Sequence, residues 1–251
     1  MSAHPPRDTK RIASSSIQRQ RSADDDLPSA LSAAMPVLMP LLALVLMLGS
    51  ALVLSAMFPD VRASLNTALL GQKAFWYLTR ASAFVSYGLL WWSMALGLTI
   101  TNRMARAWPG GPTVSDLHEY ASILGLIFGA IHALSLLGDH YIGYSLTQIL
   151  VPFASTDYQP LWVGLGQISF YLMISVTLSF YVRRLIGGRA WRTVHYVSFG
   201  IFALALAHGI WSGSDSGTAW AQWAYAASGL SLVALTFYRI QVRRRLAELA
   251  W

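Results

Sequence analysis

The chain has 251 residues, of which 55% are hydrophobic and only 12% are charged, about half the charged share of soluble domains. This composition predicts an integral membrane protein, so we interpret the net charge of +7 as a topology signal rather than a nucleic-acid-binding surface. The absence of cysteine excludes disulfides and every metal or cofactor attachment through a thiolate.

Residues 1–34 are polar and predict a disordered tail. Six apolar stretches follow, each close to the ~20 residues that cross a bilayer core as a helix. They cover about 37–58, 75–100, 116–138, 160–182, 191–212 and 218–240. The first stretch and its polar leader are too long for a signal peptide, so we expect a retained helix. The predicted fold class is an all-α integral membrane six-helix bundle over residues 35–240, ended by a basic tail at 241–251.

Most of the 18 Lys and Arg residues lie in the N-terminal tail, in the loops after the second and fourth stretches and at the C-terminus. The loops 139–159 and 213–217 contain none. The positive-inside rule therefore places both termini in the cytoplasm of a multi-pass protein of the plasma (inner) membrane, surrounded by lipid. Six crossings agree with this parity, and they make the third and fifth helices run in the same direction.

Four histidines lie on these two predicted helices, His118 and His132 on the third and His195 and His208 on the fifth. The members of each pair are 14 and 13 residues apart, which corresponds to rises of ~21 and ~20 Å along a helix. Two parallel helices thus offer one imidazole each at a lower and at an upper level. Such an arrangement suits the axial ligation of two b-type haems for electron transfer. His140 follows Asp139 at the outer end and belongs to neither level.

The angle around the helix axis between the two histidines differs between the third and the fifth predicted helix. Fourteen residues return within ~40° of the starting face, whereas thirteen leave His208 about 140° from His195 on an ideal helix. Two explanations stay open: the fifth helix is distorted near Ser198–Gly200, or the two haems are displaced sideways. At the start of the third helix, Ser115 or Asp116 is the expected cap.

The stretches "HEYASILGLIFGAIH" and "HYVSFGIFALALAH" resemble the histidine pairs of the ferric reductase-like transmembrane domain superfamily. That superfamily includes ferric reductases, NADPH oxidases and the bacterial haem subunit of methionine sulfoxide reductase. The resemblance covers about residues 75–240. It implies that His118 and His195 hold an inner haem and that His132 and His208 hold an outer haem.

The 251 residues contain no flavin- or nicotinamide-binding domain, and the glycines of "GLGQIS" fall inside a predicted helix rather than in a phosphate-binding loop. We therefore expect electrons from a separate cytoplasmic donor, which is a flavoprotein, a bound flavin (FMN or FAD) or a quinol. The expected acceptor lies outside the membrane and is ferric iron, oxygen or a partner protein.

Arginines are the candidate partners of the haem propionates. Arg192, with Arg183, Arg184 and Arg189, lies near the inner level, although positive-inside anchoring explains the same residues. Arg80 lies near the outer level, where a propionate, a loop carboxylate or the lipid interface is its expected partner. The loop 139–159 is expected to form a lid at the outer face.

The leading hypothesis is a di-haem b oxidoreductase subunit that passes electrons outwards across the membrane, with no catalytic residue of its own. The alternatives are a quinol-oxidising cytochrome b subunit and a haem-free transport or structural subunit.

Overall fold

The computed structural model describes residues 56–102, 104, 110–156 and 158–248, together with 42, 45, 46, 49, 50 and 53. The chain divides into two units, Met1–Val53 and Leu54–Trp251, and the helices with stated bounds belong to the second. All regular elements in this described part are helical. Four segments, Ala74–Thr101, Gly111–Gly138, Pro160–Tyr181 and Gly188–Ser212, are long and apolar enough to cross a membrane. These observations confirm an all-α class and indicate a multi-pass membrane protein.

The helices of the described part are α2 (Pro59–Leu70), α3 (Ala74–Thr101), α4 (Gly111–Ser135) with the 3₁₀ turn η2 (Leu136–Gly138), α5 (Leu146–Leu150), α6 (Pro160–Tyr181), α7 (Arg183–Ile186), α8 (Gly188–His195), α9 (Val197–Ser212) and α10 (Ala219–Glu248). The second, third, fourth and sixth predicted spans each coincide with one long helix, and the fifth with α8 and α9, whereas α2, α5 and α7 match no predicted span. The sixth predicted span falls on α10, which is not among the four apolar segments. The first predicted span and the N-terminal tail lie largely outside the described residues.

The start of α4 differs from the prediction. The helix begins at Gly111, directly after Gly110 with φ 116°, and Pro112 lies in its first turn, where a missing N–H has no cost. The Ser115 hydroxyl donates to the Gly111 carbonyl inside the helix (2.9 Å). The predicted cap by Ser115 or Asp116 is therefore wrong, because Gly110 and Pro112 already start the helix upstream.

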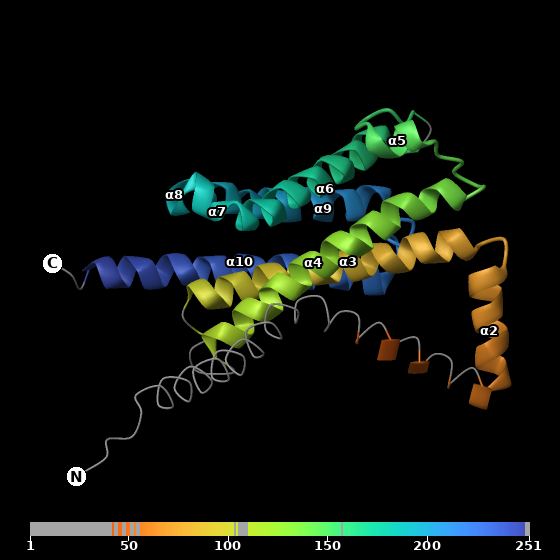
Figure 1. The fold of residues 1–251 in the computed structure, drawn as a ribbon, viewed down its shortest axis with the longest axis horizontal. Helices are drawn as coiled ribbons and strands as arrows, with labels where there is room; N and C mark the ends of the chain where they lie inside the picture. Colours follow the sequence, from red (N-terminus) through yellow and green to blue (C-terminus); the bar gives the residue numbers. More distant parts are fainter. Residues whose placement is uncertain are drawn as a thin grey trace, which may run out of the picture. The chain divides into compact units, whose positions relative to one another are not determined.

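Two packed helix pairs position the site. Helix α3 packs along α4, α6 packs along α9, and α10 contacts α3 and α9 (Figure 1). A buried apolar cluster joins the two pairs and α10. It consists of Leu90, Met94, Leu98, Met173, Ile201, Phe202 and Leu232. This core sets α4, which carries His118 and His132, opposite α9, which carries His208 and follows His195 at the end of α8.

The loop between α4 and α6 is fastened to α6. A capping box between Ser145 and Gln148 starts α5. The Gln167 side-chain amide donates to the backbone carbonyls of Gln148 and Ile149 (both 2.7 Å). The Tyr158 hydroxyl donates to the Ser212 carbonyl at the end of α9 (2.8 Å). Burial, and then the neighbouring Tyr144, raises the pKa of Tyr158, so this hydroxyl keeps its proton and remains a donor.

Candidate functional site: two facing histidine pairs

The structure brings the four histidines together as two pairs across the gap between α4 and the α8–α9 segment. The ring centroids of His118 and His195 are 5.9 Å apart, with an angle of 70° between the ring planes. The ring centroids of His132 and His208 are 6.1 Å apart, with an angle of 71°. Because α4 and the α8–α9 segment present their histidines in the same order along the chain, the two segments run in parallel.

The Nδ1 atoms of three of these histidines point away from their partners. The Nδ1 atom of His118 lies 2.8 Å from the Ser93 carbonyl, and that of His132 lies 2.9 Å from the Thr79 carbonyl. The Nδ1 atom of His208 lies 2.9 Å from the Trp162 carbonyl. A carbonyl can only accept, so each Nδ1 carries the proton and each Nε2 keeps a free lone pair.

The support of the α4 histidines is repeated at both levels. Ser93 and Thr79, the two carbonyl acceptors on α3, have the same spacing as His118 and His132 on α4. Each acceptor residue also hydrogen bonds through its hydroxyl to a serine of α4, Ser93 to Ser122 (2.7 Å) and Thr79 to Ser135 (2.6 Å). One arrangement of carbonyl, imidazole and paired hydroxyls thus occurs twice along the α3–α4 contact.

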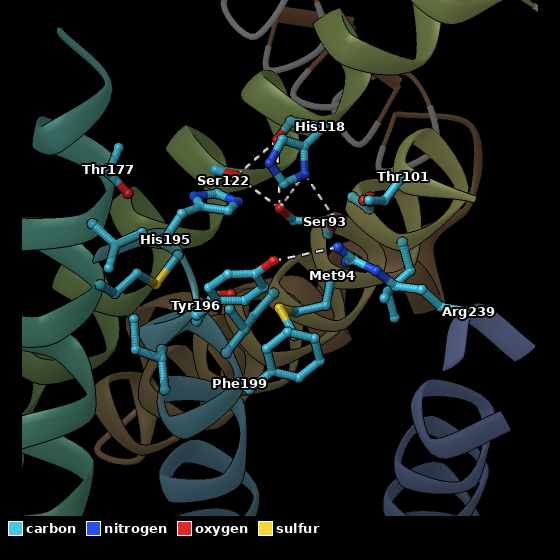
Figure 2. Close-up of a pocket in the computed structure, with 17 residues that line it drawn as sticks. Ser93, Met94, Thr101, His118, Ser122, Thr177, His195, Tyr196, Phe199 and Arg239 are labelled. Carbon is cyan, nitrogen blue, oxygen red and sulfur yellow. Dashed lines mark hydrogen bonds between the residues drawn. The ribbon is translucent and has the colours of Figure 1, made fainter. Parts of the chain in front are cut away.

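The fourth histidine, His195, is held differently. No hydrogen bond joins its ring to another residue within the described ranges. Its ring lies 5.2 Å from the Trp191 ring, with an angle of 30° between the planes. The ring thus packs against Trp191 and lies opposite His118, as Figure 2 shows for the two histidines.

Gly166 makes room for the ring of His208. A Cβ atom added at Gly166 would lie 2.5 Å from the His208 Nδ1 atom and 2.7 Å from its Cγ atom, closer than side chains tolerate. The same helix uses Gly164 to receive the ring of Phe153. The glycines of "GLGQIS" therefore admit two side chains into the helix surface, a role that the sequence pattern did not indicate.

The fifth predicted span is interrupted between its two histidines. α8 ends at His195 and α9 begins at Val197. The Tyr196 N–H donates to the carbonyls of Arg192 and Thr193, and the Phe199 N–H donates to the Tyr196 carbonyl. Bonds of the i to i−3 kind wind a helix more tightly than α geometry, which adds rotation over the 13 residues. A distorted helix is therefore observed, and its distortion lies at Tyr196, just before the expected Ser198–Gly200.

A cavity adjoins the lower pair. Its volume is about 100 Å³, below the ~300–1,000 Å³ of typical ligand pockets. Figure 2 shows His118, His195, Tyr196 and Arg239 around it. Apolar side chains of α3, α6 and α9 form much of the wall, including Leu90, Met94, Met173, Val176 and Ile201.

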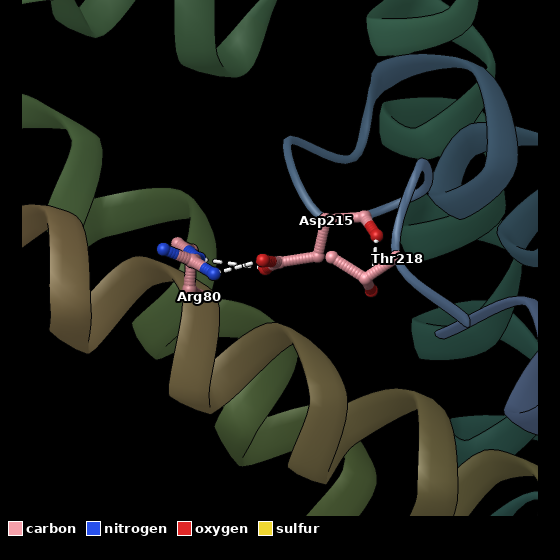
Figure 3. A network of polar contacts seen from close by, with 3 residues as sticks. All are labelled: Arg80, Asp215 and Thr218. Carbon is pink, nitrogen blue, oxygen red and sulfur yellow. Dashed lines mark hydrogen bonds and ion pairs between the residues drawn. The ribbon is translucent and has the colours of Figure 1, made fainter. Parts of the chain in front are cut away.

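The remaining predicted site residues lie elsewhere. Arg80 forms a two-pronged ion pair with Asp215, in the loop before α10 (Figure 3), with Nε donating to Oδ2 at 2.7 Å and Nη2 to Oδ1. Its guanidinium also stacks over Trp76 (3.9 Å). Of the three partners expected for Arg80, the structure thus supplies the loop carboxylate. Arg192 is exposed and does not line the cavity. His140 is exposed and lies outside both pairs.

No protein-family model, curated protein or solved structure matches this chain.

Proposed function

We propose that the protein is a di-haem b electron-transfer subunit, in which His118 with His195 and His132 with His208 each hold one haem iron. The supporting observation is the spacing of the rings. Two imidazoles on one metal have centroids about 6 Å apart, since metal–nitrogen bonds are about 2 Å long and the ring centre lies about 1 Å further. Both observed separations, 5.9 and 6.1 Å, agree with this value.

The protonation pattern supports the same proposal. With Nδ1–H donated to carbonyls, the rings of His132 and His208 direct unprotonated Nε2 atoms into the gap, and no hydrogen bond joins the two described rings. Facing lone pairs repel unless an electron-pair acceptor lies between them. Metal-bound histidines characteristically donate their other nitrogen to a carbonyl in this way, which fixes the ring and raises its basicity.

A porphyrin explains why two donors suffice at each level. Within the described ranges, no group of three or more His, Asp or Glu side chains could hold a metal ion, whereas a structural zinc ion requires four ligands. Haem iron takes four ligands from its macrocycle and would supply a one-electron carrier at each level. The chain's part is to orient the imidazoles, surround the groups with apolar side chains and hold the two levels at a fixed rise of ~21 Å along α4.

The proposal also includes six membrane crossings and a direction of electron transfer. Six crossings, with α10 as the last, would place the basic ends of the chain in the cytoplasm and the pair His132–His208 near the outer face. Electrons then pass from a cytoplasmic donor to an outer acceptor, as the resemblance to ferric reductase-like domains implies.

Optical spectroscopy of the purified full-length protein tests this function. Reduction should produce the absorbance bands of b-type haem, with two haems per chain. His132→Ala should retain one haem, because only the upper pair loses a ligand, and His140→Ala should retain both. A folded wild-type preparation without b-type bands, or a His132→Ala variant with two haems, would contradict the proposal. Haem reduction by added quinol alone would favour the quinol-oxidising alternative.

A further inference from the structure

The cavity beside the lower histidine pair contains a cation that the proposed function has not used. Arg239 comes from α10 and is half-buried at the cavity wall, where Tyr196 of the α8–α9 break also lies. Its Nη2 atom donates to the Tyr196 hydroxyl at 3.4 Å, a long hydrogen bond. In Figure 2 the guanidinium points inwards, towards the Tyr196 hydroxyl.

The charge of Arg239 is not balanced by a carboxylate of the described chain. The sole ion pair within the described ranges joins Arg80 to Asp215, far along α3 and α10 from this cavity. A half-buried cation without a counter-ion is unfavourable in an apolar wall. Of the five guanidinium N–H donors, one makes the long bond to Tyr196, so most donors are available to a bound group.

The chemistry of these two side chains selects a carboxylate. The planar guanidinium fork matches the two oxygens of a carboxylate, and such bonds are about twice as strong as neutral ones. The Tyr196 hydroxyl adds a further donor beside the fork. We propose that Arg239, assisted by Tyr196, binds a propionate carboxylate of the haem held by His118 and His195. This inference depends on the proposed function, and it assigns to Arg239 the role for which Arg192 was the candidate from its position in the sequence.

The test is a redox titration of the full-length protein. A cation close to a haem favours the reduced form, which carries one more electron. Arg239→Gln should therefore make the midpoint potential of the lower haem more negative, by about the 59 mV that correspond to a tenfold change for one electron. Titration of His132→Ala, which is expected to keep the lower haem alone, assigns the lower step.

Three variants accompany this measurement. Arg244→Gln removes an exposed arginine of the same helix, and Arg192→Gln removes the earlier candidate; both should leave the lower potential at the wild-type value. Arg239→Lys should restore most of the shift, because the charge returns. Tyr196→Phe should give a smaller negative shift, since one donor is lost and the cation stays.

The outcomes separate the inference from the proposed function. A negative shift of the lower step alone, restored by lysine, supports the role of Arg239. Loss of the lower haem in Arg239→Gln but not in Arg239→Lys supports it as well. Equal potentials in Arg239→Gln and Arg244→Gln overturn the inference while leaving the di-haem function intact, and so does a shift found only in Arg192→Gln. A wild-type protein without haem overturns both.

Discussion

Backbone groups of neighbouring helices orient three of the four histidine rings. Backbone carbonyls of Ser93, Thr79 and Trp162 accept from three of the imidazoles. Such carbonyls are available because a neighbouring helix approaches closely enough for a side chain to reach its backbone. Gly166 is the clearest example, since the absence of a side chain there lets α9 bring His208 against α6.

We expect Gly166→Ala to disturb the upper pair. The new methyl group would lie 2.5 Å from the His208 Nδ1 atom, so the ring must leave the Trp162 carbonyl or the helices must separate. Overpacking of this kind costs about 1–3 kcal/mol. The thermal unfolding midpoint should fall, and haem content should decrease from two towards one per chain.

Gly200→Ala is the matched control for this substitution. Nothing lies within 4 Å of a Cβ atom at Gly200, and alanine is favoured over glycine in a helix by about 0.5–1 kcal/mol. Its unfolding midpoint should stay the same or rise, and both haems should be retained. Equal behaviour of the two variants would show that Gly166 does not seat His208.

Contacts between elements fix how the helices meet. The break at Tyr196 lets α8 and α9 present two histidines 13 residues apart to one partner helix. At the other end of the helices, the Arg80–Asp215 pair ties α3 to the loop before α10. This pair is partly buried, with exposed side-chain fractions of 29% for Arg80 and 10% for Asp215.

Loss of one member of this pair should destabilise the protein. Asp215→Asn leaves the Arg80 cation without its counter-ion, and breaking a buried pair costs about 3–5 kcal/mol. We expect a smaller loss of about 2 kcal/mol, because the exposed part of Arg80 stays solvated. Thermal unfolding in detergent measures the change.

A double-mutant cycle with Arg80→Met shows whether the two residues act together. The double variant should be more stable than the sum of the single effects predicts, because neither charge is then left alone. The same variants also test whether Arg80 binds a haem propionate, one of the partners expected for it. A change in the upper haem potential in Arg80→Met but not in Asp215→Asn would show that Arg80 binds the haem rather than the loop.

The number of crossings is a property of the entire chain. Tyr141 follows α4, on the side where α6 begins and α9 ends, and a crossing α10 would bring the basic C-terminal residues to the opposite side. The protein contains no cysteine, so single cysteines can be labelled without background. Tyr141, which is 94% exposed, and the exposed Arg244 are suitable positions.

We expect a membrane-impermeant maleimide to label Tyr141→Cys but not Arg244→Cys in intact cells. After permeabilisation both should react. This outcome follows if α6, α8–α9 and α10 each cross the bilayer between the two positions and the positive-inside rule holds. Labelling of both positions in intact cells would mean that α10 does not cross, and the reverse pattern would invert the topology.

Hydropathy and residue spacing in the sequence are sufficient to predict where the long helices lie and that the histidines occupy two levels. In lipid, backbone groups must bond within a segment, so apolar stretches of sufficient length become helices, and residue number converts directly into rise. α3, α6 and α9 therefore lie where hydropathy predicted them. The start of α4 differs from the prediction because Gly110 and Pro112 start the helix upstream of the expected cap residues. The fifth span also differs, because it is divided at Tyr196 into α8 and α9.

The partners of each side chain depend on how the helices pack. Arg80 reaches Asp215, and His208 reaches the carbonyl of Trp162 past Gly166. Arg239, rather than Arg192, lies at the cavity. These residues are far apart in the sequence, and their contacts arise from the crossing of α3, α4, α6, α9 and α10. Hydropathy and residue spacing predict single helices. Which faces of two helices come into contact is determined by the packing of their side chains along the whole length of the contact.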